Sequence, residues 1–454
     1  MQSAHPSPAD LVVHGAHVIT MDPARPEIPD ALIVIRGDRL EIVTDRPEKL
    51  PAARRTLDLG GQVVIPGLVN VHTHTILTMV RGVAEDMGFA PAYTPGVPHG
   101  HEVTEEEAVA LARLGAAEAL LFGSTLINDS YVHADLTLPA MGDLGMRVTT
   151  CGRIHDVDFS RVHEGIWEHR TGIGDRTLGE AVELFERWHG KGDGRLGVQF
   201  AAHAPDTCSR ELLVRVAAER DRLGARVNGH LSQSRMENER VQERDGMSPS
   251  ELLEDVGLLD HRFTAAHCMF VSDTDIERIG RGRTSVAHIP KGNATGGRIA
   301  PTGALRRAGA NLTLATDNMH ADMIEVMRWG LLVGRIQEGC INDFWQPRHM
   351  LEMATLGGAR AMGMESEIGS LEPGKKADLV ALDFRRPHLV PRLNDLGNLL
   401  HTAQGRDVTT VVCNGEVVVE DARLCRGDMD TIMSDAQQAA EALWARAREQ
   451  LRGN

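Results

Sequence analysis

The chain has 454 residues, of which 42% are hydrophobic and 25% charged, the balance of a folded globular protein. Its 48 basic and 64 acidic residues give a formal net charge of −16 at pH 7. This charge disfavours nucleic acid and anionic membranes as partners, because both recognise a basic protein surface. We therefore expect a small-molecule substrate, no nucleic-acid partner and no membrane partner.

Neither the N-terminus nor the cysteine pattern points to export. The first residues, MQSAHPSPADLVV, lack the basic stretch and long apolar segment that mark a signal peptide. No run approaches the roughly 18 apolar residues that a membrane span needs. The six cysteines include no CxxC pair and are interpreted as reduced thiols. We predict a soluble cytoplasmic protein.

The first sixty residues predict β-strands, since DLVVHGAHVITMD and DALIVIRGDRLEIV alternate or run apolar between Gly, Asp and Pro. From residue 63 onward, short apolar runs alternate with helix-like stretches such as TEEEAVALARLGAAEALLFG. The apolar runs are QVVIPGLVNVH, STLIND, RVTTCGR, LGVQFAAH, ARVNGH, RFTAAHC, TSVAHIP and NLTLATDN. Such strand–helix units predict an α/β fold with a parallel sheet, and eight strands close a (β/α)8 TIM barrel.

Beyond residue 371 the pattern returns to strands. KKADLVALD is one, and VTTVVCNGEVVVED predicts a hairpin because NG favours a two-residue turn. The tail SDAQQAAEALWARAREQLRG predicts an amphipathic helix. We predict a small composite β-sandwich from residues 1–62 and 372–454, with the terminal helix, flanking a barrel at 63–371.

Possible metal ligands fall where the predicted barrel strands end. These residues are His72, His74, His203, His230, His267 and Asp317. In such a barrel the carboxyl ends of the strands converge on one face, where active sites lie. His72 and His74 are two apart on an extended chain, so their side chains point the same way and can share a cation. Imidazole and carboxylate together suit zinc, or another divalent ion such as iron or cobalt.

Each histidine also has an ordinary structural interpretation. A lone buried histidine is more often a core residue with its hydrogen bonds satisfied, and among 21 histidines some fall near strand ends by chance. The HxH pair weakens that interpretation, and further members at successive strand ends argue against coincidence. We therefore predict that the two histidines of NVHTHT are metal ligands.

Several longer motifs resemble the amidohydrolase superfamily, in particular its triazine-hydrolase and cytosine-deaminase-like branch. The motifs are VIPGLVNVHTH, HAPDTCSRELL, DGMSPSELLEDVGLLDHRFTAAHC, LATDN and ATLGGARAMGMESEIGSLEPGKKADLVALD. The resemblance covers nearly the whole chain. It implies a (β/α)8 barrel with a composite β-sandwich, one divalent metal ion per subunit with zinc ahead of iron or cobalt, and a homodimer or higher homo-oligomer.

The resemblance also implies roles for individual residues. The metal ligands would be His72, His74, His230 and Asp317. His267 would hold and polarise the metal-bound water, and His203 would contact the substrate. Asp317 would carry a proton from water to the leaving group, while His267 stabilises the tetrahedral oxygen. Binuclear relatives use a bridging lysine, but none of the five lysines lies on the candidate fourth strand, so one metal ion is expected.

The sequence departs from the family in the stretch NGHLSQS. Deaminases of this branch carry a glutamate three residues after the metal histidine of the fifth strand, and it protonates the ring nitrogen of the substrate. Gln233 stands at this position here, and an amide cannot deliver a proton. Glu237 or Glu239 could substitute only if the loop folds back.

Two further departures from the family follow Asp317 and include Lys291, respectively. Asn318 fits the family, but the rest of NMHADMIEVMRWG is foreign to it. Lys291, in HIPKGNA, replaces a small polar residue and is either a surface residue or a cation at the pocket mouth. We predict that His203, Gln233, Asn318 and Lys291 contact the substrate.

These departures together favour an open C–N bond over a heterocyclic ring. We therefore expect a metal-dependent hydrolase that cleaves a small amide, urea or (thio)carbamate, such as a xenobiotic. The alternative enzyme is a hydrolytic deaminase or dechlorinase of an N-heterocycle of the triazine, pyrimidine or purine type. A metal-free scaffold is the non-enzymatic alternative, and the complete set of candidate ligands argues against it.

Overall fold

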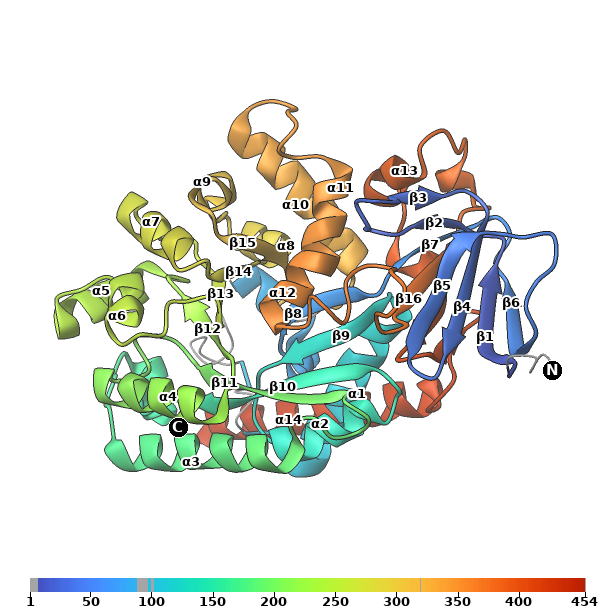
Figure 1. Ribbon diagram of the computed structural model, residues 1–454. Helices are drawn as coiled ribbons and strands as arrows, with labels where there is room; N and C mark the ends of the chain where they lie inside the picture. Colours follow the sequence, from blue (N-terminus) through green and yellow to red (C-terminus); the bar gives the residue numbers. More distant parts are fainter. Residues whose placement is uncertain (1–6, 88–96, 99–101, 319, 454) are drawn as a thin grey trace.

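Eight parallel strands form the central sheet of the computed structural model, which describes residues 7–87, 97–98, 102–318 and 320–453 (Figure 1). The strands are β8 (Leu68–Thr73), β9 (Ser124–Asp129), β10 (Arg147–Ile154), β11 (Leu196–Ala202), β12 (Val227–Leu231), β13 (Phe263–His267), β14 (Ser285–His288) and β15 (Asn311–Leu314). Their spatial order follows the sequence. The Asp317 amide donates to the carbonyl of His72 and the His74 amide to that of Asp317, both at 3.0 Å, so β8 and β15 meet and close the barrel. The predicted (β/α)8 barrel is confirmed.

Helices follow most barrel strands and cover the outside of the sheet (Figure 1). They include α1 (Glu105–Leu121), α3 (Thr171–Trp188), α4 (Arg210–Leu223), α5 (Arg235–Asp245), α7 (Asp273–Arg281) and α10 (Met323–Glu338). Several begin with a reciprocal cap. In α1 the Thr104 hydroxyl accepts from the Glu107 amide and the Glu107 carboxylate accepts from the Thr104 amide. Each such cap satisfies two backbone donors that the first turn would leave unpaired.

The two ends of the chain share a seven-stranded sheet outside the barrel. In it β7 (Gln62–Pro66) pairs antiparallel with β16 (Leu379–Asp383) and parallel with β2 (His17–Ile19). A four-stranded sheet built on β1 (Ala9–His14) and β4 (Ala31–Arg36) packs against it, and one apolar core joins the two sheets. The expected composite β-sandwich is therefore present. The domain limits at residues 62 and 371 stay a prediction.

The run QVVIPGLVNVH, predicted as one strand, is two strands in different sheets. β7 belongs to the seven-stranded sheet and β8 to the barrel, and Gly67 separates them. A Cβ at Gly67 would lie 2.0 Å from Thr125 Oγ1, so only glycine allows this close approach. The first barrel strand is thereby tied directly to the β-sandwich.

The expected hairpin and terminal helix are both present. β17 (Val408–Cys413) and β18 (Glu416–Glu420) flank Asn414 and Gly415, whose φ angles of 53° and 80° fit the predicted turn. Helix α14 (Met429–Gly453) lies along α1, where Arg446 pairs with Glu107 at 2.6 Å. In Figure 1, α14 is the red helix beside α1.

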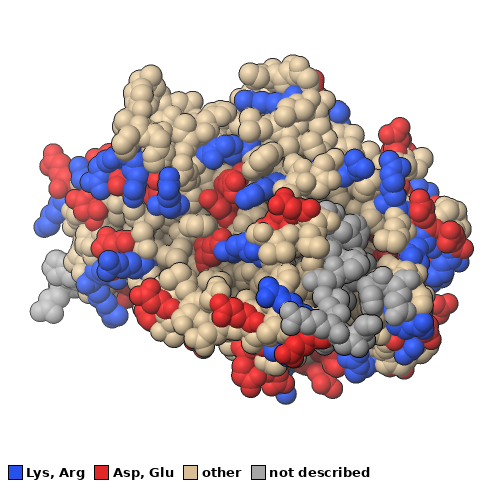
Figure 2. Space-filling model, turned by 180° about the vertical axis from the view of Figure 1, so that it is seen from behind, with Lys and Arg blue, Asp and Glu red and all other residues tan. Residues whose placement is uncertain are grey.

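On the face shown in Figure 2, Lys and Arg side chains are interspersed with Asp and Glu and do not form one continuous basic surface. None of the described helices is long and apolar enough to cross a membrane.

A buried ion pair connects the barrel to the β-sandwich. Arg147, at the start of β10, lies 3.4 Å from Asp378 Oδ1 and donates to Asn414 Oδ1 at 3.1 Å. Its side chain is only 2% exposed. We expect Arg147→Met to lower the free energy of unfolding by about 3–5 kcal/mol, because Asp378 would remain buried without its cation. Denaturant unfolding measures this, with the exposed Arg176→Gln as control. A loss no larger than that of the control would contradict the assigned role.

Candidate metal centre

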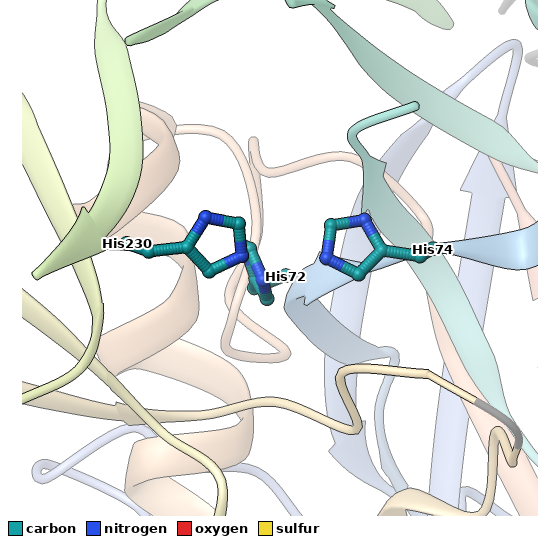
Figure 3. Close-up of side chains that lie close together, drawn as sticks. All are labelled: His72, His74 and His230. Carbon is teal, nitrogen blue, oxygen red and sulfur yellow. The ribbon is translucent and has the colours of Figure 1, made fainter. Parts of the chain in front are cut away.

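The described residues place five candidate side chains around one point at the carboxyl ends of the barrel strands. Ligand atoms of His72, His74 and His230 lie within 4.8 Å of one another, as do those of His72, His267 and Asp317. Figure 3 shows the rings of His72, His74 and His230 converging on a shared space. Four barrel strands or their immediate extensions, β8, β12, β13 and β15, thus supply the cluster.

Hydrogen bonds to backbone carbonyls fix the outer nitrogens of two of these rings. His74 Nδ1 lies 2.5 Å from the carbonyl oxygen of Ser130, and His230 Nδ1 lies 2.7 Å from that of His203. A carbonyl only accepts, so each Nδ1 carries the proton and each Nε2 keeps its lone pair for the centre of the cluster. His72 Nε2 is buried and makes no hydrogen bond to any described residue. Such an orphaned nitrogen fits a metal ligand.

Asp317 supplies the carboxylate of the cluster. Its Oδ1 lies 3.6 Å from His72 Nε2 and 3.4 Å from His74 Nε2, and its Oδ2 lies 3.9 Å from His267 Nε2. The backbone of Asp317 is left-handed, with φ 64°, and that of His267 has φ 74°. Such strained residues persist where the surrounding structure holds them, and they cluster at functional sites.

Burial disfavours the charged forms of His74, His230 and His267, whereas Asp317 stays ionised. Burial and then the charge of His72 lower the pKa of His74 to about 3, and burial holds the pKa of His230 and of His267 below the usual value. Burial alone would raise the pKa of Asp317, but the contact with His72 and the neighbouring imidazoles hold it well below its usual range. Neutral imidazole and carboxylate are the forms that bind a metal ion. The donor set therefore fits zinc or a similar divalent ion.

His267 is oriented by a residue that the sequence did not single out. Its Nδ1 lies 2.9 Å from Asn293 Oδ1, an acceptor, so Nδ1 carries the proton and Nε2 faces Asp317 with a lone pair. In this form His267 accepts a hydrogen bond from water and donates only after it has taken a proton. Asn293 lies in HIPKGNA, whose other residues include Lys291.

His203 lies beside the cluster, but both of its ring nitrogens are already engaged. Its ring centroid is 4.9 Å from that of His230. Nδ1 lies 2.8 Å from Thr207 Oγ1 and Nε2 lies 2.9 Å from an Arg153 guanidinium nitrogen. Because arginine only donates, His203 Nε2 accepts, and Nδ1 is the protonated nitrogen. Arg153 at the end of β10 therefore stands with His203 at the rim of the site. The predicted substrate contact of His203 stays a prediction.

In the loop after His230, Glu237 is buried against the backbone, whereas the side chain of Gln233 is partly exposed. Glu237 is fully buried, and its carboxylate accepts hydrogen bonds from the amides of Ser232 and Gln233 at 2.7 and 2.8 Å. Burial and the neighbouring Asp206 raise the pKa of Glu237 to about 8. The carboxylate does fold back, but onto the backbone of its own loop, so it supports Gln233 instead of replacing the missing acid. Glu239 is exposed.

The two remaining departures from the family, Lys291 and the stretch after Asp317, are in contact in the structure. Lys291 Nζ donates to Glu325 Oε2 at 2.7 Å, and Glu325 lies in the first turn of α10, within the foreign stretch after Asp317. Asn318 directly follows Asp317 and is partly exposed. Contacts of Lys291 and Asn318 with substrate stay predictions.

Other supporting residues were not found from the sequence. Asp129, at the end of β9, accepts hydrogen bonds from the amide and hydroxyl of Thr75 at 2.7 and 2.8 Å. Burial raises the pKa of Asp129 to about 6, and it lies within electrostatic reach of His72. The only sequence signal was its position at a strand end, in STLIND.

Known proteins are similar to this chain over nearly their whole length. The profile of the amidohydrolase family matches residues 63–418. The chain is 33% identical over 446 residues to a 5′-deoxyadenosine deaminase of Methanosarcina barkeri, covering 96% of this chain and 99% of that protein. It is 34% identical over 426 residues to a 5-methylthioadenosine/S-adenosylhomocysteine deaminase of Moorella thermoacetica, covering 91% and 94%.

Solved structures show the same architecture. An adenosine deaminase from Xanthomonas campestris with bound zinc superposes with a TM-score of 0.85 at 25% identity, covering 96% of this chain and 99% of that one. An atrazine chlorohydrolase from Arthrobacter aurescens complexed with zinc gives a TM-score of 0.84 at 21% identity, covering 95% and 100%. The second likeness concerns the fold alone.

Proposed function

The chain belongs to the amidohydrolase family, and on that basis we propose that it is a hydrolytic deaminase of the adenine ring in a 5′-modified adenosine. The coarser function is that of a metal-dependent hydrolase acting on C–N bonds other than peptide bonds. What carries the finer proposal is the combination of the complete five-residue cluster with full-length relatives that are named deaminases.

This proposal replaces the preference for an open amide, urea or carbamate. That preference depended on three local departures, at Gln233, at Lys291 and after Asp317. The likeness to deaminases of 5′-deoxyadenosine and methylthioadenosine extends over more than nine-tenths of the chain. The heterocycle alternative is thus the better supported of the two. Within it, the purine nucleosides named for these relatives are favoured over triazines, since the triazine enzymes share only the fold at 21% identity.

The geometry assigns a role to each group of the chain. His72, His74, His230 and Asp317 would hold one divalent ion, which when bound lowers the pKa of water to supply a nucleophile near neutral pH. Asp317 is ionised, because its neighbours hold its pKa below the usual range, so it can accept protons from the attacking water and pass them to the substrate. His267 Nε2, held by Asn293, accepts a hydrogen bond from that water and orients it.

Gln233 would assist the ring nitrogen by hydrogen bonding instead of proton transfer. Its backbone is fixed by Glu237, and its partly exposed side chain has two amide hydrogens to donate. A hydrogen bond stabilises the negative charge that develops on a ring nitrogen as water adds to the neighbouring carbon. The attacking water supplies two protons in turn: Asp317 passes the first to this ring nitrogen and the second, released as the C–O double bond forms, to the departing amine.

Gln233→Glu should raise the deaminase activity of the protein. A carboxylic acid at this position can give a proton as well as a hydrogen bond, so kcat/KM for 5′-deoxyadenosine should rise about tenfold or more. Ammonia release by steady-state kinetics measures this, and Gln233→Ala is the matched control. That control should lose about 1–2 kcal/mol of transition-state stabilisation, the size of one neutral hydrogen bond. A Gln233→Glu variant no faster than Gln233→Ala would contradict the position of this side chain at the ring.

The wild-type protein tests the proposal directly. Ammonia release from 5′-deoxyadenosine, methylthioadenosine and adenosine is compared with amine release from phenylureas and carbamates. Faster turnover of any urea or carbamate than of all three nucleosides would overturn the proposal and restore the open C–N bond as the substrate.

A further inference from the structure

A second cavity opens at the end of the barrel opposite the candidate metal centre. Its volume is about 890 Å³, within the range of small-molecule sites. Arg226, which lines it, directly precedes β12, whose other end carries His230. Asn311, also in its wall, begins β15, which leads to Asp317. At about 3.3 Å per residue, the four residues from Arg226 to His230 separate the cavity wall from the metal ligand by about 13 Å.

The cavity wall is strongly basic in a chain of net charge −16. Its cationic side chains are Arg226, Arg283, Arg306, Arg360 and Lys375. Glu352 and Glu365 are the acidic residues among its lining. Five cations against two carboxylates leave a local excess of three positive charges, opposite in sign to the whole chain.

Some of these cations are neutralised and others are not. Arg360 pairs with Glu352 at 3.4 Å and with Glu365 at 2.9 Å. Lys375 pairs with Glu372 at 3.3 Å, outside the cavity lining. The acidic groups of the cavity are therefore already used by Arg360, which leaves the other arginines without a carboxylate from the wall.

The remaining three arginines make no ion pair with any residue in the described parts of the chain. Arg226 Nε donates to the carbonyl oxygen of Ala361 at 2.9 Å, and its Nη2 donates to those of His261 at 2.5 Å and of Arg360 at 3.4 Å. Its Nη1 is therefore the nitrogen that has no described partner and can face a ligand. Arg306 donates to the Phe344 carbonyl at 2.5 Å and lies over that ring at 4.1 Å. Arg283 is exposed at the cavity wall, one residue before Thr284 and β14.

Burial disfavours the charged form of two of these three arginines. Burial lowers the pKa of Arg226 and of Arg306 below the usual guanidinium value, and the charge of Arg262 lowers that of Arg226 further. Their nearby carboxylates, Asp260 and Glu352, act in the opposite direction but do not restore the value. Burial takes solvating water away from these guanidinium groups. An anion bound in the cavity would reduce the resulting free-energy cost, because it would pair with their positive charge.

We propose that this cavity binds a small anion carrying two linked phosphate groups. Guanidinium groups present a planar fork of donors that matches phosphate oxygens two at a time. Arg226, Arg283 and Arg306 come from three separate segments of the barrel and its helices, so they can surround such a group from several sides. The site lies away from the cluster of histidines and is independent of the proposed deaminase reaction.

Calorimetric titration with inorganic pyrophosphate at low salt tests this site, with citrate as a polycarboxylate of similar charge. Pyrophosphate also binds free metal ions, so the titration is made on the His72→Ala background as well as on the wild type. We expect saturable binding in both, tighter for pyrophosphate than for citrate. Binding of citrate alone, or of pyrophosphate only when the metal centre is intact, would overturn the assignment.

Arginine variants localise the binding. Arg306→Gln and Arg283→Gln should each weaken pyrophosphate binding about tenfold, the cost of one charged hydrogen-bond partner. Arg283 has no described structural partner, so its variant should fold normally even if Arg306→Gln does not. Arg176→Gln, an exposed arginine on α3, is the matched control. Equal affinity in Arg283→Gln, Arg306→Gln and Arg176→Gln would exclude the cavity as the binding site.

Discussion

His72→Ala and Asp317→Ala should each lose the bound metal ion and reduce kcat by about a thousandfold or more, because the ion supplies several kcal/mol of transition-state stabilisation. His72 belongs to both ligand groups of the cluster, and its Nε2 makes no hydrogen bond to any described residue. Asp317 contributes the carboxylate nearest to His72 and His74 and would also carry the proton. Removing either side chain therefore removes a ligand, and the aspartate variant loses the proton carrier as well.

Metal content by elemental analysis and ammonia release under saturating substrate measure the two effects separately. His401→Ala is the control, since His401 is an exposed residue at the end of α13 (Asp395–His401), outside the cluster. Chelation of the wild type should reproduce the loss, and added zinc or cobalt should restore activity to the wild type and not to His72→Ala. An active His72→Ala variant with a full complement of metal would contradict the assigned ligands.

His267→Ala should keep the metal ion yet lose about a hundredfold or more in kcat, as expected when a group that stabilises the transition state is removed. His267 Nε2 is 3.9 Å from Asp317 Oδ2, the longest of the three contacts between Asp317 and the histidines, which favours a role toward water over one as a tight ligand. Asn293 holds the ring from behind. Asn293→Ala should therefore cost less, about tenfold, since such outer partners typically contribute about 10- to 100-fold.

The same two variants distinguish a water-orienting histidine from a ligand. If His267→Ala loses its metal together with its activity, His267 is a fourth imidazole ligand. If Asn293→Ala loses more activity than His267→Ala, Asn293 does not act by orienting the His267 ring. Circular dichroism of both variants verifies that the barrel is intact.

The strands of the barrel and the members of the cluster were predictable because both depend on local patterns. Short apolar runs bounded by polar residues marked β8 to β15, and a polar residue at the end of a parallel strand must lie at the catalytic face of a barrel. Position at strand ends pointed to six residues, and the resemblance to the amidohydrolase superfamily implied which of them hold the metal ion. The six are His72, His74, His203, His230, His267 and Asp317. The separation of β7 from β8 could not be predicted from the sequence. It depends on how closely Gly67 approaches Thr125, which is a contact between distant strands.

The roles of supporting residues were harder to predict for the same reason. Arg153 and Asn293 act through His203 and His267, and nothing in the sequence near either residue indicates those contacts. Gln233 was visible in the sequence, but its weight was misjudged. A single amide in place of an acid removes a proton donor without removing the hydrogen bond, so it does not by itself exclude a heterocyclic substrate.

The most direct test of the account is the product formed by the zinc-loaded wild-type protein from 5′-deoxyadenosine. Loss of the 6-amino group changes the ultraviolet spectrum of the purine and releases one ammonia per molecule, and both signals can be followed in the same reaction. We predict that the two signals change at the same rate, and that this rate exceeds amine release from any phenylurea or carbamate. In the His72→Ala variant both signals should be slower by about a thousandfold or more. Unchanged 5′-deoxyadenosine, methylthioadenosine and adenosine in the presence of an enzyme that hydrolyses ureas or carbamates would contradict the proposed function.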